Sequence, residues 1–298
     1  MTSILTQRSL WNAASDEQQQ LALQQLLAKN PALAEQFTFL GLRQFSCGDI
    51  ANTVAEFCHK QTQMIFHLLP GDLKYCPGLT KAQANYVAEH FGISEGEIEF
   101  NEIIMYQGYS IRISPFLISR YVVTERVWSQ AGGAQLLAYF GDDCAADAIH
   151  RVQALATAEH LGLKVPSEMQ WEYACKAGST SVFFWGDEPN DAMAITEYNT
   201  DFSQGYRTFT EAEQKPANAF GLLGMIGNTS EWVADNTSSR GPFAPTQKPL
   251  VVPGSDMGVL RGGGAIYGWN YNRSTSRIRS SSFVDGGVGV RFAFEVQI

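Results

Sequence analysis

Few side chains in this sequence are both chemically reactive and suitably spaced to act together. The five cysteines are odd in number and widely separated, and no two of them form a Cys-x-x-Cys pair. Such a pattern is typical of reduced, buried thiols in a cytoplasmic protein rather than of a disulfide framework. The cysteines are Cys47, Cys58, Cys76, Cys144 and Cys175.

The stretch VLRGGGAIYGWNYNRSTSRIRSSSFVDGGVGVRFAF, residues 259–294, has the side chains of a contact surface instead. It contains no cysteine, no histidine and a single acidic residue, Asp285. Tyrosine and tryptophan supply rigid contact area, and serine and asparagine supply adaptable hydrogen bonds, as in binding loops. Its middle lacks the apolar alternation of a core element, so we expect it to be exposed. The candidate ligand-binding residues are Tyr267, Trp269, Asn270, Tyr271, Asn272, Ser274, Ser276, Ser280 and Ser282.

Composition narrows the classes of partner. The chain is 45% hydrophobic, which is enough to bury a core, and its net charge of -9 argues against general binding of nucleic acid or of an anionic membrane. No window reaches the length of apolar sequence that a membrane span needs, and the N-terminus does not have the pattern of a signal peptide. We therefore expect a cytoplasmic protein without a membrane span.

The elements that must position these residues begin with an expected helical prefix, residues 1–62. Ser15 can cap a helix over DEQQQLALQQLLAKN, which has acidic residues in its first turn and ends at Asn30-Pro31. A second helix is expected over GDIANTVAEFCHKQTQMIF, residues 48–66. The apolar face of the first helix would consist of Leu21, Leu23, Leu26 and Leu27.

From residue 67 onward the pattern changes to short strands, a few helices and then loops. HLLPGDLKYCPG predicts two strands around a Pro-Gly turn, and GYSIRISPFLISRYVVT also predicts strand. Helices are expected over TERVWSQAGG, over AADAIHRVQALATAEHLG, and after Ser167, which forms a capping box with Gln170. After Ser179 the sequence has almost no helical period. The expected class is α+β, with a large loop-rich part.

Six ordered blocks span about residues 64–296: FHLLPGDLKYCPG, SPFLISRYVVT, VPSEMQWEYACKAG, FFWGDE, NAFGLLGMIGNTSEWVAD and VLRGGG…RSTSR…GVRF. Together they resemble the formylglycine-generating enzyme family, whose domain is also called the sulfatase-modifying factor domain. The resemblance implies a variant of the C-type lectin fold over residues 63–298, with small antiparallel sheets and a few packed helices.

The same blocks contain residues that we interpret as scaffold. Trp171, Tyr173, Trp185 and Trp232 can anchor a loop-rich core, and Asn228 and Glu231 can hold backbone amides or cations. Arg261 and Arg291 flank the final segment, where each guanidinium can donate to several carbonyls.

The resemblance departs from the family where its enzymes bind copper(I). Those enzymes have two cysteines, five residues apart, soon after the RGG turn, and the corresponding positions here hold Tyr267 and Asn272. A phenol and an amide do not replace two thiolates for a soft metal ion. We therefore expect neither copper nor formylglycine-generating activity, and a non-enzymatic role is favoured.

A related branch, the ergothioneine-type sulfoxide synthases, binds iron through the motif H-x3-H-x-E. The five histidines of this chain do not have that spacing: His59, His67, His90, His150 and His160. An iron-dependent oxidoreductase with ligands from distant residues stays open as an alternative.

The resemblance also implies structural calcium. One site would use Glu231 with the carbonyls of Gly227 and Thr229, and a second would use Asn199 and the carbonyl of Thr200. Gly224 stands where the family often has Asp or Asn, which removes an oxygen ligand from a site that needs several.

Finally, the C-terminal segment resembles that of the variable proteins of diversity-generating retroelements. In those proteins a lectin-like fold ends in a region, here 259–294, whose codons are varied by adenine-directed mutagenesis. The leading hypothesis is thus a non-catalytic binding protein whose ligand is a protein, a sugar or a small molecule. The other alternative is a purely structural or partner-binding domain.

Overall fold

Three antiparallel or mixed sheets and several short helices form the part of the chain that the structure describes. The structure is a computed structural model that describes residues 3–94, 97, 110–136, 141–200, 215–236, 249, 257–281 and 286–298. These elements confirm the expected α+β class.

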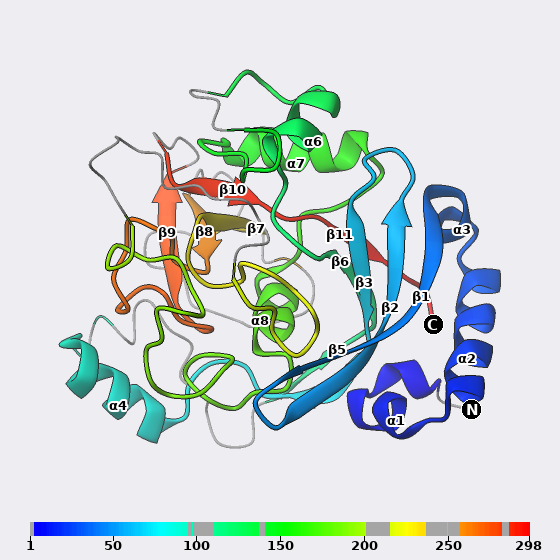
Figure 1. Ribbon diagram of the computed structural model, residues 1–298, viewed down its shortest axis with the longest axis horizontal. Coiled ribbons are helices and arrows are strands. Elements are labelled where there is room, and N and C mark those ends of the chain that lie inside the picture. The colour runs from blue at the N-terminus through cyan, green and yellow to red at the C-terminus, as the bar shows by residue number, and fades with distance from the viewer. Residues whose placement is uncertain are drawn as a thin grey trace.

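The largest sheet has five antiparallel strands in the order β1-β2-β3-β6-β11. Early and late parts of the chain therefore belong to one sheet, in which β1 and β11 are the two edge strands; Figure 1 draws β1 and β2 in blue and β11 in red. The strands are β1 (Phe37–Cys47), β2 (Ile50–His59), β3 (Ile65–Leu69), β6 (Phe116–Ser119) and β11 (Ala293–Glu295).

The helix expected over residues 48–66 is wrong, because this stretch forms β2 and the start of β3. β1 and β2 form a hairpin whose two-residue turn includes Gly48 at a φ of 56°, in the left-handed region that glycine favours. In β2, Val54 and Phe57 are buried, and pairing with β1 on one side and β3 on the other outweighs the local helical pattern. A domain boundary at residue 62 would separate β2 from β3 within one sheet.

The first expected helix is confirmed as α2, with Ser15 as N-cap and a capping box with Gln18. Leu23 and Leu26 are buried, whereas Leu21 is 55% exposed and lies outside the apolar face. The helical segments before the hairpin are η1 (Ile4–Thr6), α1 (Arg8–Ala13), α2 (Asp16–Lys29) and α3 (Pro31–Gln36).

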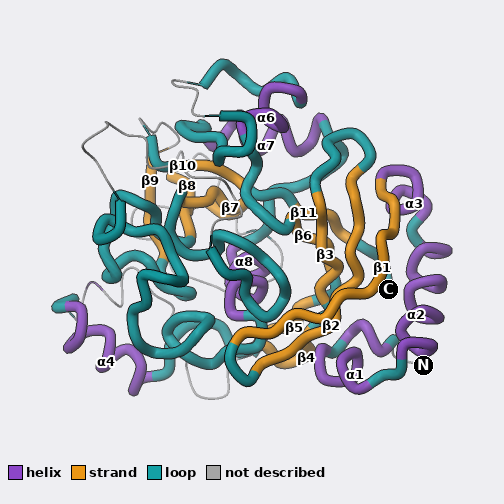
Figure 2. The backbone as a smooth tube through the Cα atoms, viewed as in Figure 1, coloured by secondary structure: helices purple, strands orange, loops and turns teal. Residues whose placement is uncertain are grey.

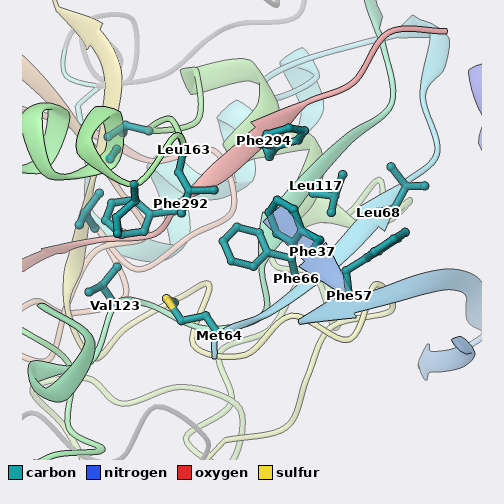
Figure 3. Packing of buried hydrophobic residues seen from close by; sticks show 14 of the residues in the cluster. Phe37, Phe57, Met64, Phe66, Leu68, Leu117, Val123, Leu163, Phe292 and Phe294 are labelled. Atoms are coloured by element: carbon teal, nitrogen blue, oxygen red, sulfur yellow. The ribbon is translucent and has the colours of Figure 1, made fainter. Parts of the chain in front are cut away.

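One hydrophobic core joins these first helices to the sheet. Phe37 lies 5.2 Å from both Phe66 and Phe294 between ring centroids, so β1, β3 and β11 share one aromatic cluster. Figure 3 shows these rings together with Phe57 and Leu117 on neighbouring strands.

A second, four-stranded sheet has the order β10-β7-β8-β9, in which β10 pairs with β7 in parallel. Its strands are β7 (Ser230–Asn236), β8 (Met257–Arg261), β9 (Arg277–Ser281) and β10 (Val288–Val290). A two-stranded sheet pairs β4 (Asp72–Tyr75) with β5 (Ile111–Ile113). The two strands expected around Pro70-Gly71 are confirmed. Of the stretch expected as strand, residues 108–124, β5 and β6 form the strand part, residues 120–123 are not strand, and residues 108–109 lie outside the described residues.

The helix α8 occupies the centre of the molecule, and all of its residues are buried (Figure 1). Its expected capping box between Ser167 and Gln170 is confirmed. The remaining helices are α4 (Lys81–Phe91), α6 (Glu125–Gln130), α7 (Arg151–His160) and α8 (Glu168–Lys176). The expected helix at α6 is thus confirmed, and the helix expected over residues 145–162 is confirmed for Arg151–His160, whereas residues 145–150 are not helical.

Loops dominate the chain after α8. Figure 2 shows them as long teal segments around the four-stranded sheet, and the described residues after Lys176 contain no helix. Within the described ranges, no helix has the length and apolar character to cross a membrane.

Candidate functional site

Arg261, the last residue of β8, anchors the start of the C-terminal segment. Its guanidinium is buried, and it donates to the carbonyls of Ser274 and Thr275 at 3.2 and 2.6 Å. It also pairs with Glu172 of α8 at 2.7 Å and with Glu168 at 3.4 Å. One side chain therefore ties both sides of the loop that follows β8 to the central helix.

Arg291 anchors the other end of the segment in the same way. Its Nε and Nη2 donate to the two carboxylate oxygens of Glu231 at 2.7 and 2.6 Å, and the indole N–H of Trp171 donates to the same carboxylate at 2.7 Å. Arg291 also donates to the carbonyls of Ser119 and Leu223, each at 3.0 Å. The predicted bracing of carbonyls by Arg261 and Arg291 is therefore confirmed.

The loop between these anchors is held from inside by Asn272. Its side-chain N–H groups donate to the carbonyls of Gly264, Tyr267 and Gly268, and its oxygen accepts from the backbone N–H of Gly264 at 2.8 Å. Gly263 must be glycine, because its φ is 70° and a Cβ there would lie 2.2 Å from the amide oxygen of Asn272. The backbone of residues 264–272 is therefore fixed by one buried amide.

The nine candidate ligand-binding residues fall into three groups. The buried ones are Trp269, Asn272, Ser274 and Ser276; the half-buried ones are Tyr267, Asn270, Tyr271 and Ser280; and Ser282 lies outside the described residues. The expected exposure of the whole stretch is therefore wrong, because the Trp269 ring packs beneath the loop and the Asn272 side chain bonds to the loop's own carbonyls. Only the half-buried group can meet a ligand without rearrangement.

The outward part of this loop, residues 264–271, is called the display loop below. The rings of Tyr267 and Tyr271 lie 5.4 Å apart, and Ile266 beside them is 37% exposed. Burial raises the pKa of the Tyr267 phenol, so it stays protonated at neutral pH. Trp269 lies beneath the loop, edge-on to Phe183 at 5.5 Å. A rigid aromatic surface on a packed base results.

Two residues at this surface, Glu197 and Tyr198, were not indicated by the C-terminal pattern. The backbone N–H of Glu197 donates to the carbonyl of Tyr267 at 3.2 Å, which joins residues 196–198 to the display loop. Tyr198 is 63% exposed. The available signal was an acidic stretch: residues 177–206 contain five acidic residues and neither lysine nor arginine.

The residues proposed for calcium do not fit a cation well. The Glu231 carboxylate is buried and already holds the Arg291 guanidinium and the Trp171 indole, so a dication there would lie against a positive charge. The oxygen of Asn199 accepts from the N–H of Thr196 at 2.9 Å, and its amide nitrogen donates to Ala194 and Asp191 carbonyls. The backbone N–H of Gly227 donates to the carbonyl of Gly262, and Thr229 is buried. Of Thr200, only the backbone carbonyl is an expected calcium ligand.

Two of the five histidines and the last cysteine are buried in the fold. His67 is buried between the Phe220 carbonyl at 2.8 Å and Glu56 at 3.3 Å, and His59 contacts Thr62 at 2.9 Å. Burial raises the pKa of Cys175 to about 12, which keeps it a thiol. Across the part of the chain that the structure describes, no three His, Cys, Asp or Glu side chains converge as metal ligands.

This frame of paired arginines around a loop-rich sheet agrees with comparisons with known proteins. The sequence profile of the sulfatase-modifying factor enzyme 1-like domain matches residues 75–296. The chain belongs to this family. The formylglycine-generating enzyme of Mycobacterium tuberculosis is 39% identical over 87 residues, which are 26% of this chain and 29% of that enzyme. The match thus spans less than a third of that relative's length.

Solved structures show the same fold. PvdO from Pseudomonas aeruginosa superimposes with a TM-score of 0.62 at 21% identity, covering 79% of this chain and 95% of that one. Variable protein 1 of Treponema denticola superimposes with a TM-score of 0.56 at 16% identity, covering 85% and 98%. The expected fold, the C-type lectin-like variant of this sulfatase-modifying factor family, is therefore confirmed.

Proposed function

We propose that this family member is a non-catalytic binding protein that presents its display loop to a ligand. The observation that carries this proposal is the contrast within the loop. Tyr267, Asn270 and Tyr271 are half-buried, whereas Trp269 and Asn272, which lie among them in the sequence, are buried in the base of the loop.

Such an arrangement favours binding for a physical reason. A loop that is already fixed loses little conformational entropy when a ligand arrives, so more of the contact energy contributes to affinity. Tyrosine is also among the residues that most often dominate binding energy. The display loop combines both properties.

The chemistry of the loop supports the same proposal. Tyr267 and Asn272 occupy the two positions where the family's enzymes hold copper-binding cysteines, and in this chain Asn272 serves as a brace and Tyr267 as surface. The ligand class stays open among protein, sugar and small molecule.

We further propose that the outward codons of the display loop are diversified by a retroelement. The similarity in fold to a protein named a variable protein supports this proposal. Sequencing the 3′ end of the gene across one population should show substitutions at Tyr267, Asn270 and Tyr271 and none at Trp269 or Asn272. Substitutions spread evenly over both groups, or a gene without a near-copy of this region beside a reverse transcriptase gene, would contradict it.

Two matched libraries test the display function. The first randomises Ile266, Tyr267, Asn270 and Tyr271; the second randomises the buried Trp269, Asn272, Ser274 and Ser276. Most members of the first should melt cooperatively near the parent temperature, and selection on unrelated proteins and sugars should yield binders from it. Most members of the second should unfold. Equal loss of folding in both libraries would show that the loop is core and not a display surface.

A further inference from the structure

Three side-chain oxygens converge over Gly268, in the middle of the display loop. A Cβ on this residue would lie 2.6 Å from Oε1 of Glu197, 2.9 Å from Oη of Tyr198 and 3.0 Å from Oδ1 of Asn270. The glycine is what lets these oxygens approach, since any side chain would push them apart. We call Gly268, Glu197, Tyr198 and Asn270 the oxygen cradle.

The base of the cradle is rigid. The carbonyl of Gly268 accepts from the backbone N–H groups of Tyr271 and Asn272 at 3.1 and 3.2 Å and from the Asn272 side chain at 3.0 Å. Arg273 donates to the carbonyls of Trp269 and Asn270, which fixes the backbone beneath the Asn270 side chain. The three oxygens are thus carried by a fixed loop on one side and by exposed side chains on the other.

The chemistry of the cradle selects a donor with positive charge. A carboxylate and an amide oxygen are acceptors, and a phenol oxygen can accept as well. In the described part of the chain, the side chains of Glu197 and Tyr198 have no hydrogen-bond partner of their own. The surrounding stretch, residues 177–206, has five acidic residues and no lysine or arginine. The cations that reach this region, Lys215 and Arg273, donate to backbone carbonyls, so among the described residues the Glu197 carboxylate has no ion-pair partner and can attract a cation.

We propose that the oxygen cradle is a subsite for an alkylammonium group, supplied by a lysine side chain of a protein partner. An ammonium carries three N–H donors on one compact centre, which matches three neighbouring oxygens. Tyr267 and Tyr271 flank the cradle residues Gly268 and Asn270 in the sequence, and their paired phenol rings would offer surface for the alkyl chain. This inference rests on the proposed display function and gives that surface a ligand class.

Amide chemical shifts in 15N-labelled full-length protein test the subsite. The probe is N-acetyl-lysine amide, with N-acetyl-norleucine amide as the uncharged match, N-acetyl-arginine amide as the planar cation and cadaverine as a free amine. The lysine probe should shift the amides of Glu197 and Gly268 at lower concentration than the other three. A stronger response to arginine or to cadaverine would overturn the lysine assignment.

Two variants and a control locate the binding. Glu197→Gln and Gly268→Ala should each raise the dissociation constant of the lysine probe by at least about tenfold, because Glu197→Gln removes the negative charge and Gly268→Ala fills the cradle. Gly268→Ala should still fold, since its φ is not in the left-handed region and the atoms it meets are ends of flexible side chains. Asp191→Asn, which neutralises an exposed acid of the same stretch, should leave the affinity for the lysine probe unchanged. A loss of affinity as large as that of Glu197→Gln would show that the net charge of the stretch, and not the cradle, attracts the probe, and would contradict the proposed subsite.

The outcomes separate this inference from the display function. If the norleucine or a sugar probe shifts the amides of Tyr267 and Tyr271 while the lysine probe does not shift Gly268, the cradle is wrong and the display loop remains a binding surface. If neither those probes nor the library selection gives binding at residues 264–271, both proposals fail.

Discussion

At the scale of single residues, the buried pair of Arg291 and Glu231 determines whether the C-terminal segment keeps its place. Both side chains are removed from water, and their charges are stabilised only by each other and by the surrounding hydrogen bonds. Removing one member of such a pair leaves an uncompensated buried charge, which costs more than the pair itself contributes.

Arg291→Ala should therefore reduce the free energy of unfolding by about 3–5 kcal/mol. Arg126→Ala, which breaks an exposed pair with Asp143, is the matched control and should cost less than about 1 kcal/mol. Urea titration followed by circular dichroism measures both. Equal effects of the two substitutions would mean that Arg291 does not carry the frame.

The residue types at positions 267 and 272 also predict that the protein lacks copper-dependent formylglycine-generating activity. Because they are tyrosine and asparagine, the chain lacks the thiolate pair that copper(I) prefers. Incubated with copper(I), oxygen and a cysteine-containing peptide, the protein should give no formylglycine product, as judged by mass spectrometry after reduction of any disulfide. Repeated turnover with stoichiometric bound copper would refute the non-catalytic proposal.

Asn272 also shows what residue types do and do not predict. Its type suited a contact surface as well as a brace, and the sequence contains nothing that tells which way an amide points. The roles of Arg261 and Arg291 could be predicted from their type, because a guanidinium with five donors beside glycine turns has few uses other than binding backbone carbonyls. Glu197 and Tyr198 could not be predicted, because they lie far in sequence from the loop that they join.

At the scale of elements, the capping residues in the sequence predicted where helices begin, whereas the pairing of strands distant in sequence could not be predicted from local patterns. Ser15, Thr124 and Ser167 each begin a helix where the sequence places them, since a cap is a contact between residues three apart. The β1–β2 hairpin depends on β3 and on α1, whose Trp11 donates to the Thr53 carbonyl at 2.8 Å. No local pattern contains those partners.

The end of β2 carries a titratable group whose burial makes the element sensitive to acid. His59 is buried against the rings of Phe37 and Phe66, and burial lowers its pKa from 6.5 to about 4. Between those values the unfolded chain binds a proton that the folded chain does not. His59 therefore reduces stability as the pH falls from 6.5 towards 4, by at most about 1.4 kcal/mol per pH unit.

His59→Gln should flatten the decline in unfolding free energy over that pH range relative to the parent. His160→Gln, at the exposed end of α7, is the control and should keep the parent's slope. Urea titrations at pH 6.5, 5.5 and 4.5 measure the slopes. The same slope in the parent and in His59→Gln would show that the histidine is not held neutral in the fold.

At the scale of the whole molecule, the two ends of the described chain are built into one another. The side chain of Asn30, at the junction of α2 and α3, both donates to the carbonyl of Gln297 and accepts from its N–H, at 2.8 and 2.7 Å. The family profile covers residues 75–296, so three strands of the five-stranded sheet, β1, β2 and β3, lie before its first residue in the sequence. The first seventy residues are thus part of the core and not an appendage.

Removal of residues 1–62, the expected prefix, should therefore abolish cooperative folding of the remainder. The truncation removes β1 and β2 and exposes β3 as a new sheet edge. It also strips Leu26, Phe37 and Phe57 from the cluster that covers Phe66 and Phe294. Unpaired edges and uncovered aromatic side chains favour aggregation.

The control is the full chain with a short Gly-Ser insertion between Gly48 and Asp49, at the turn of the hairpin, where an insertion disturbs no strand pairing beyond the tip. The insertion variant should melt as one transition close to the parent, whereas residues 63–298 alone should show no thermal transition and should precipitate. A soluble, cooperatively melting 63–298 fragment would mean that the hairpin and the first helices are a separate module after all.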